Sequence, residues 1–565
     1  PELALGNAPE NFKYRYNWNA PIISSPHNRN TIYHAGNVVL RTTDGGVSWS
    51  IVSPDLTRNE KGRQGPGGGP YTNEAAGGEN YNTIMYLVES PHEKGVLWAG
   101  SDDGLIHLTR DGGENWENVT PPDLPEGIVN SIEVSPHEKA TAFAVVMRYK
   151  FMDLKPYIFK TTDYGKTWSK IVHGITDPHT FVRVVREDPI RKGLLYAGTE
   201  TGLYISFDGG LYWQPFQLNL PVVPINDLIF RDNDLIAATA GRSFWILDDV
   251  GALQNSPAPR QPVAIFKPKD TYLLFGGSSD KPVPGLGQNP RQGVTFDYYL
   301  DKEADSLDLE LEVMHNGKLI RTITNKKPDD FKSWPGGPAK PPLLPAKRGF
   351  NRFTWDFCKE TLPAVNDVFV YGSYAGSRVG PGTYALRMTL DGLTSETEVT
   401  ILPNPKVEAS RDDYEEQQMA LDKIETTIRE MHLAVREMRS AKSQLESYAK
   451  LLKDHENAGE LLNIGDSLVS RIETWEQNLI QPKQKTFQDV INYNNQLNAE
   501  LMHLKGYMDS ADPKVTAGAK ERLNDLLTEW AIFKKERDRI VDTEMAAYNE
   551  MYDVKGFPAI IIPEE

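Results

Sequence analysis

Two spacings of apolar side chains divide the chain. Before Pro405, apolar residues form short runs or alternate with polar ones, as in Leu307, Leu309, Leu311 and Val313. Such alternation buries one face of a strand and predicts β-structure. Beyond Pro405 the apolar spacing changes to three and four residues, which predicts amphipathic helices. The pattern therefore predicts β-domains followed by a helical domain.

A pattern of the form Ser/Thr-x-Asp-x-Gly-x-x-Trp occurs four times in the first part of the chain. Its aspartates and tryptophans are Asp44 and Trp49, Asp111 and Trp116, Asp163 and Trp168, and Asp208 and Trp213. Successive aspartates lie 67, 52 and 45 residues apart. The last two spacings are close to the roughly 40–50 residues of a four-stranded propeller blade. We therefore predict an all-β propeller over residues 1–255.

Each residue type of the repeat has a structural purpose. Asp caps a tight hairpin by accepting backbone N–H bonds, Gly supplies a positive φ, and Trp packs between neighbouring sheets. We therefore interpret the repeated aspartates as turn residues. Only about five blades are visible, and the chain starts at Pro1 without an initiator Met or a signal segment. We expect an incomplete propeller from the C-terminal portion of a longer protein.

The repeat resembles the bacterial neuraminidase (BNR, or Asp-box) repeats of sialidases, two-propeller xyloglucanases and sortilin-type receptors. The closing segment 240–249, Ala-Gly-Arg-Ser-Phe-Trp-Ile-Leu-Asp-Asp, is similar to the last blade of large exported bacterial proteins of the sortilin-like or "glycosyl hydrolase BNR repeat" type. This resemblance implies export to the periplasm, the outer-membrane surface or the medium. It also implies either ligand binding or glycoside hydrolysis.

Two further domains are predicted after the Pro-rich linker 256–262. Strand patterns over 263–403 resemble the immunoglobulin-like β-sandwich of the flagellar hook-cap protein. Residues 406–555 predict an antiparallel four-helix bundle, in which Ser410 and Asp413 begin the first helix as a capping box. That helix keeps its apolar stripe to Leu452, and the next three are expected over about 459–480, 484–508 and 516–551.

Composition excludes several classes of function. A formal net charge of −17 disfavours nucleic acid as a partner. The single cysteine, Cys358, excludes an internal disulfide framework and a multi-thiolate metal site. No apolar run is long enough for a transmembrane segment. We expect neither a metal nor a cofactor.

Candidate chemistry lies in the predicted turns and loops. Glycoside hydrolysis needs two carboxylates across a sugar-sized cleft, and Asp102, Asp103 and Glu200 are weak catalytic candidates because they recur after equivalent strands. Three residues of the long Gly-rich loop 63–82 and three arginines of separate blades are candidates for ligand binding: Tyr71, Asn73 and Glu74, and Arg148, Arg183 and Arg242. No spacing fixes their geometry.

The leading functional hypothesis is a binding protein for a peptide, protein or glycan ligand, held in a cell-envelope or surface complex. The partners would be that ligand, together with a missing N-terminal half or other envelope subunits. A glycoside hydrolase of the xyloglucanase or sialidase type is the first alternative. A structural subunit of a surface assembly is the second.

Overall fold

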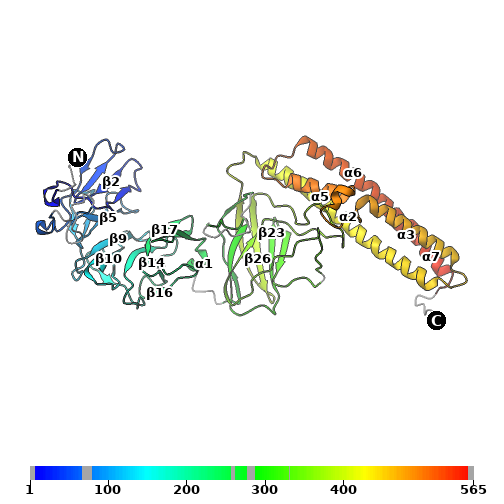
Figure 1. Ribbon diagram of the computed structural model, residues 1–565, viewed down its shortest axis with the longest axis horizontal. Coiled ribbons are helices and arrows are strands. Elements are labelled where there is room, and N and C mark those ends of the chain that lie inside the picture. Colours follow the sequence, from blue (N-terminus) through cyan, green and yellow to red (C-terminus); the bar gives the residue numbers. More distant parts are fainter. Residues whose placement is uncertain (1–6, 66–78, 256–260, 276–286, 330, 558–565) are drawn as a thin grey trace. The chain divides into compact units, whose positions relative to one another are not determined.

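The computed structural model describes residues 7–65, 79–255, 261–275, 287–329 and 331–557. The chain forms two compact units, residues 1–257 and 258–565. The first unit is built from small β-sheets, and the second from β-sheets followed by long helices (Figure 1). The predicted order of β-structure followed by a helical region is confirmed.

The first unit contains five antiparallel sheets, which we call blades 1 to 5. Blades 1 to 4 have four strands each and blade 5 has three. The strands are β1 (Ile22–Ser24), β2 (Ile32–Ala35), β3 (Val39–Thr42) and β4 (Ser50–Ile51) in blade 1; β5 (Ile84–Glu89), β6 (Leu97–Ser101), β7 (Ile106–Thr109) and β8 (Glu117–Asn118) in blade 2; β9 (Ile128–Val134), β10 (Ala142–Met147), β11 (Ile158–Thr161) and β12 (Ser169–Lys170) in blade 3; β13 (Val182–Glu187), β14 (Leu195–Thr199), β15 (Leu203–Ser206) and β16 (Gln214–Pro215) in blade 4; and β17 (Ile225–Arg231), β18 (Asp234–Thr239) and β19 (Phe244–Leu247) in blade 5. Short helices η1 (Pro9–Asn11), η2 (Lys61–Arg63), η3 (Tyr149–Phe151) and α1 (Gly251–Gln254) lie between or beside them.

Consecutive blades pack face to face, with β5, β9, β13 and β17 next to one another. Neighbouring residues of a middle strand therefore enter different cores, because side chains alternate between the faces of a sheet. Leu97 packs with blade 1, whereas Trp98 packs with blade 3. In blade 4, Leu195 and Tyr196 divide in the same way between blades 3 and 5. This is the packing logic of a propeller, and among the described strands no sheet closes the arc.

Each Asp box closes the hairpin between the third and fourth strands of its blade. Asp44 accepts hydrogen bonds from the backbone N–H of Ser48 at 3.0 Å and from the Thr42 hydroxyl at 2.7 Å. The corresponding bonds form at the other three aspartates, Asp111, Asp163 and Asp208. All four carboxylates are thus engaged in their own turns.

The Ser-Pro-His segments of blades 1, 2 and 3 each contact the blade that follows. His27 contacts the backbone oxygen of Ser90 at 2.8 Å, and His137 that of Asp188 at 2.7 Å, in each case through Nε2. Their imidazole Nε2 must carry the proton, because a carbonyl oxygen only accepts. These bonds join the turns between the first and second strands of successive blades.

The β-region of the second unit has two sheets around one core. The first has the order β20 (Val263–Ile265), β22 (Val294–Leu300), β25 (Gly349–Trp355), and the second the order β21 (Thr271–Tyr272), β27 (Leu393–Leu402), β26 (Gly382–Leu390), β23 (Leu309–His315), β24 (Lys318–Thr324). Alternate residues of β22 and β26 are buried, including Phe296 and Leu386. The predicted hairpin turn at Asn316-Gly317 has both residues at positive φ. The immunoglobulin-like assignment stays a prediction.

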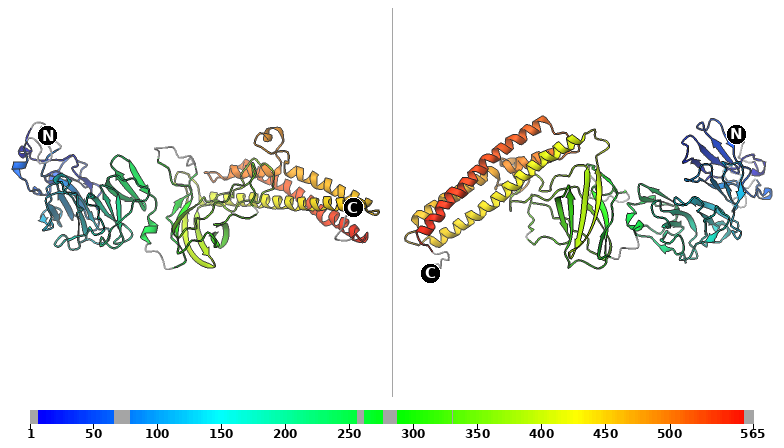
Figure 2. Two further views of the ribbon diagram at one scale, coloured as in Figure 1. Left: turned by 60° about the horizontal axis from the view of Figure 1, so that its bottom comes forward. Right: turned by 180° about the vertical axis from the view of Figure 1, so that it is seen from behind.

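Long helices complete the second unit. They are α2 (Arg411–Leu452), α3 (Gly459–Leu479), α4 (Asp489–Asn492), α5 (Leu497–Met508), α6 (Ala517–Arg539), the π-helical segment η4 (Ile540–Met545) and α7 (Ala546–Val554). The capping box predicted at Ser410 and Asp413 is present. Helices α2 and α6 run side by side around an apolar core (Figure 2). Within the residues that the structure describes, no helix is long and apolar enough to span a membrane.

The helix predicted over 484–508 is wrong in its first half. Residues 489–492 form one helical turn, and the continuous helix starts only at Leu497. Side chains compete for the backbone here, since the Gln484 amide donates to the carbonyl of Tyr493 and to the side chain of Asn495. The fourth predicted helix is also not uniform, because its α-helical pattern is interrupted by η4.

Candidate functional site

The two ends of the blades carry different sequences. The Asp boxes and the Ser-Pro-His turns occupy one end. The turns between second and third strands, and the connections from one blade to the next, occupy the other because the strands alternate in direction. We call this second end the loop end. The described candidates in the turns all lie there: Asp102, Asp103, Glu200, Arg148 and Arg242.

Asp102 and Asp103 are completely buried between blades 1 and 2, with 1% and 0% of their surface exposed. Asp102 accepts hydrogen bonds from the backbone N–H and the hydroxyl of Thr83, at 2.8 and 3.0 Å. Asp103 accepts from the Arg58 N–H at 2.8 Å and from the Asn82 amide at 2.6 Å. Burial, and secondly the charge of Asp103, raise the pKa of Asp102 well above its usual range. Both carboxyl groups thus fix the connection between blades and face no open cleft.

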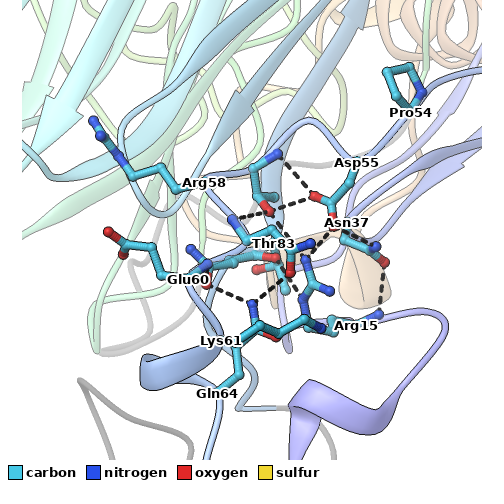
Figure 3. Close-up of polar contacts among 12 residues, drawn as sticks. Arg15, Asn37, Pro54, Asp55, Arg58, Glu60, Lys61, Gln64 and Thr83 are labelled. Carbon is cyan, nitrogen blue, oxygen red and sulfur yellow. Dashed lines mark hydrogen bonds and ion pairs between the residues drawn. The ribbon is translucent and has the colours of Figure 1, made fainter.

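Arg15 is the centre of the same buried polar network (Figure 3). Its Nη2 donates to the Asp55 carboxylate at 2.7 Å, and its Nε to the backbone oxygen of Asn82 at 3.2 Å. Asn37 accepts from the Arg15 N–H at 2.9 Å and donates to Asp55 at 3.1 Å. The network joins the segment before blade 1 to both of the first two blades. Sequence analysis missed it, because no repeat or spacing marks Arg15.

A second polar cluster surrounds Glu126, in the connection from blade 2 to blade 3. Tyr81 and Arg63 both donate to its carboxylate. Arg148 donates through Nε to the Glu126 backbone oxygen at 2.9 Å and forms an ion pair with Asp153. The guanidinium of Arg148 is thus occupied in holding its own loop.

The loop between the second and third strands of blade 3, residues 148–157, is longer than the equivalent loops 102–105 and 200–202. Asp153 fixes its base by accepting from Arg148 and from the Tyr157 hydroxyl, the latter at 2.7 Å. Its tip exposes Tyr149 and Met152. Met152 is 91% exposed, and its backbone adopts the left-handed conformation. The Tyr149 ring stacks on Phe181 with centroids 5.3 Å apart. A supported loop therefore presents apolar groups to solvent.

The other two arginine candidates, Arg183 and Arg242, bind different partners and do not form a common site. Arg183 binds Glu200 in an ion pair of 2.6 Å, so a predicted ligand-binding residue and a predicted catalytic residue neutralise each other. Arg242 is exposed and donates to the backbone oxygen of Gly241 in its own turn. The other three candidates, Tyr71, Asn73 and Glu74, lie outside the described residues.

Arg186, in blade 4, contacts polar side chains of three other blades, and this cluster was not predicted from the sequence. Its guanidinium donates to Asp227 at 2.7 Å and to the Tyr86 hydroxyl at 3.3 Å. Glu133 lies 3.5 Å away, and burial raises the pKa of its carboxyl to about 7 against the opposing charge of Arg186. The available signal was the charged pair Arg186–Glu187 at the end of a strand whose other residues are three valines and Arg183.

Comparison with known proteins gives one curated relative and a set of similar structures, and no family model matches the chain. The relative is a probable oligoxyloglucan-reducing end-specific xyloglucanase of Neosartorya fischeri. It is 22% identical over an alignment of 301 residues, and the match covers 46% of this chain. The chain spans 36% of the length of this relative.

The similar solved structures are β-propeller-type proteins. YCF48 bound to a D1 peptide has a TM-score of 0.27 and 16% identity, over 42% of this chain and 72% of that one. A GH74 xyloglucanase of Xanthomonas campestris has a TM-score of 0.30 and 13% identity, over 70% and 46%. PorZ, a surface component of the type-IX secretion system of Porphyromonas gingivalis, has a TM-score of 0.31 and 13% identity, over 68% and 51%. At these TM-scores the likenesses assign no function.

Proposed function

We propose that the first unit is the ligand-binding part of an exported β-propeller protein, and that the loop 148–157 contacts a peptide or protein ligand. The observation that carries this proposal is the exposed tip of that loop above a fixed base. Tyr and Met are enriched where proteins bind one another, and the flexible thioether of Met adapts to varied partners. Because Arg148, Asp153 and Tyr157 fix the base of the loop, the loop loses less conformational entropy when a ligand binds.

The state of the acidic candidates also supports binding over hydrolysis. A glycosidase needs one carboxyl group as acid and a second as nucleophile or base beside the sugar. Asp102 and Asp103 are buried and hydrogen-bonded to the backbone and to side chains of the blade connection. Glu200 is neutralised by Arg183. These three acidic side chains therefore stabilise the turns and connections of the loop end.

The proposed placement in the cell rests on the sequence resemblance described above. An exported protein with a single cysteine avoids unwanted thiol oxidation. We propose that the sandwich and helices of the second unit mount the binding unit in an envelope or surface complex.

Selection from a phage-displayed random dodecapeptide library on the immobilised chain tests this function. We expect enriched peptides that bind the Tyr149→Ala and Met152→Asp variants about tenfold more weakly than the unchanged chain. Tyr212→Ala is the matched control, since Tyr212 is an exposed tyrosine in the Asp box of blade 4. Equal binding by all four proteins, or no enrichment, would reject the loop as the ligand site.

Glycoside hydrolysis is the second candidate, favoured by the sequence match to the xyloglucanase. Incubation of the full chain with xyloglucan oligosaccharides separates the two functions. We expect no new reducing ends. Release of sugar that stops in the Glu200→Gln variant would replace binding by hydrolysis as the function of the loop end.

A further inference from the structure

A cleft opens in the second unit between helix α5 and residues 369–373, which belong to the connection between β25 and β26. Its volume is about 660 Å³, within the range of roughly 300–1,000 Å³ that is usual for ligand sites. Large side chains from both elements line it: Phe369, Tyr371, Met502, His503 and Tyr507. The cleft lies entirely in the second unit and is therefore separate from the ligand loop 148–157.

Hydrogen bonds hold the wall formed by residues 369–373 near both of its ends. The indole N–H of Trp334 donates to the backbone oxygen of Val368 at 2.9 Å. At the other end, the ammonium group of Lys505 donates to the backbone oxygen of Ser373 at 2.9 Å. Lys505 is only 4% exposed. Because this wall is already fixed, it loses little conformational entropy when a ligand binds.

The cleft combines exposed aromatic rings with polar groups that can bind a ligand. Tyr371 and Tyr507 are 47% and 58% exposed. The ring of Tyr371 also lies beside that of Phe487, with centroids 5.7 Å apart. Among the described residues, no partner engages the two tyrosine hydroxyls or the imidazole of His503 in a hydrogen bond. These groups can each donate a hydrogen bond to a ligand.

A second hollow of about 320 Å³ adjoins the first, between α5 and the first turn of α6. His503 and Tyr507 border both hollows. They are four residues apart on α5 and therefore share one face of the helix. A ligand that lies across this face can place one group on each side of the pair.

A proline-rich peptide matches these features. Proline has no backbone N–H, so such a peptide presents mainly carbonyl acceptors, which suit hydroxyl and imidazole donors. In the polyproline II conformation the prolines of a Pro-x-x-Pro segment lie on one face, about 9 Å apart. Aromatic grooves bind such segments because their conformation is formed in advance. A sugar fits less well, since its hydroxyls would lose water beside Phe369 and Met502 without polar partners there.

The chain itself already holds a Pro-containing loop on this aromatic wall. Residues 335–338 have the sequence Pro-Gly-Gly-Pro. Gly336 lies so close to Phe369 that a Cβ placed on it would be 2.4 Å from the ring, and its φ is +71°. Because Gly336 also lines the cleft, the cleft continues a surface that packs against a Pro-Gly segment within the same chain.

We propose that the cleft formed by Tyr371, His503 and Tyr507 binds a proline-rich segment of a partner protein in the polyproline II conformation. The prolines pack on the tyrosine rings, and the hydroxyl and imidazole groups donate to the peptide carbonyls. This site is independent of the ligand loop in the first unit. It gives the second unit a partner of its own.

Fluorescence polarisation with fluorescein-labelled decaproline and the full chain tests the proposal. We expect saturable binding that Tyr371→Ala and Tyr507→Ala each weaken about tenfold. Tyr272→Ala is the matched control, because Tyr272 is also 47% exposed and does not line the cleft. Tyr149→Ala should leave decaproline binding unchanged, which separates failure of this site from failure of the ligand loop.

A variant that fills the cleft gives a second measurement. A Cβ placed on Gly506 meets no atom within 4 Å, and Gly506 lines the cleft. We therefore expect Gly506→Leu to abolish decaproline binding while the Tm stays equal or rises, since glycine is unfavourable within a helix. Gly459→Leu is the control, because a Cβ on Gly459, at the start of α3, also meets no atom within 4 Å.

Three results would overturn the proposal. The first is the absence of saturable decaproline binding at concentrations of the chain up to about 1 mM. The second is binding that Tyr371→Ala, Tyr507→Ala and Gly506→Leu leave unchanged. The third is binding of labelled cellohexaose in place of decaproline, lost in Gly506→Leu, which would assign the cleft to a glycan.

Discussion

His92 of blade 2 donates its Nε2–H to the backbone oxygen of Ser135 in blade 3, across 3.0 Å. The contact is the middle one of three, between those of His27 and His137. All three bonds cross a boundary between blades, at the end of the blades opposite the candidate ligand loop. They act together with Trp116, Trp168 and Trp213, whose indole N–H groups donate to backbone oxygens of the preceding blade across the same three boundaries.

Removal of one histidine contact should loosen one boundary. We expect His92→Ala to lower the free energy of unfolding by about 1 kcal/mol, because the partly buried carbonyl of Ser135 loses its donor. The measurement is urea denaturation followed by tryptophan fluorescence. His179→Ala, at an exposed histidine outside these contacts, should leave the midpoint unchanged. An equal loss in both variants would contradict the role of the bond between blades.

The Asp boxes should make the first unit sensitive to acid. Hydrogen bonds from Asn115 hold the pKa of Asp111 at about 2, and those from Thr167 hold the pKa of Asp163 at about 2. The usual value in an unfolded chain is about 3.9. A pKa lowered by folding stabilises the protein above pH ~4, and this contribution is lost as the pH falls through 2.

The double variant Asp111→Asn/Asp163→Asn should therefore be less stable than the unchanged chain at pH 7 and nearly equal to it near pH 2. Urea midpoints at the two pH values measure the difference. Asp123→Asn, at an exposed aspartate outside the boxes, is the control. A difference between double variant and unchanged chain that does not depend on pH would show that the boxes act without the carboxylate charge.

Local patterns made part of this structure predictable. The box spacing located the hairpins of four blades, because Asp, Gly and Trp have fixed roles within a few residues of one another. The stripe from Leu421 to Leu452 and the capping pair Ser410 and Asp413 set the bounds of α2 for the same reason. In each case the interacting residues are close in sequence.

Long-range partners were not predictable. The turn at Ser90-Pro91-His92 was visible in the sequence, but the acceptor of the His92 proton is 43 residues away. Nothing in the sequence marks Arg15 as a buried residue, because only the fold places Asp55 beside it. The composition of loop 63–82 predicted a ligand-binding loop. The exposed aromatic and thioether groups of loop 148–157 were not predicted, because only the structure shows that this loop is longer than the equivalent loops. The sequence therefore predicted the positions of the turns and loops, but not the contacts that their side chains make.

Arg15→Met should destabilise the junction of the first two blades. The guanidinium is 2% exposed, and its loss leaves the Asp55 carboxylate and the Asn82 backbone oxygen without this donor. Breaking a buried ion pair on one side costs about 3–5 kcal/mol. Asp55 is partly exposed, so we expect about 2–4 kcal/mol in urea denaturation.

Two further variants show whether the ion pair causes this effect. Arg29→Met, at an exposed arginine, should leave the free energy of unfolding unchanged. The double variant Arg15→Met/Asp55→Leu should recover part of the loss, since no uncompensated carboxylate remains. A double variant that is less stable by the full sum of both single effects would contradict the proposed pairing.

Glu133 should make stability depend on pH in the opposite direction to the Asp boxes. Burial raises the pKa of its carboxyl to about 7. The charge of Arg186 and a hydrogen bond with the Glu187 backbone oppose this shift, and the charges of Glu187 and Asp227 add to it. A pKa raised by folding gives a contribution that is complete below the unfolded value of about 4.3 and is lost as the pH rises through 7. The unchanged chain therefore loses stability across this range through Glu133.

Glu133→Gln keeps the shape of the side chain without the ionisable proton. We expect its stability relative to the unchanged chain to rise from pH 4.5 to 7 and then to remain constant, by about 3 kcal/mol in all. Urea denaturation at pH 4.5, 6, 7 and 8 measures this curve, with Glu117→Gln on the exposed strand β8 as control. A constant difference across the four pH values would mean that Arg186 keeps Glu133 ionised throughout, and that the cluster acts as a permanent ion pair between blades 3 and 4.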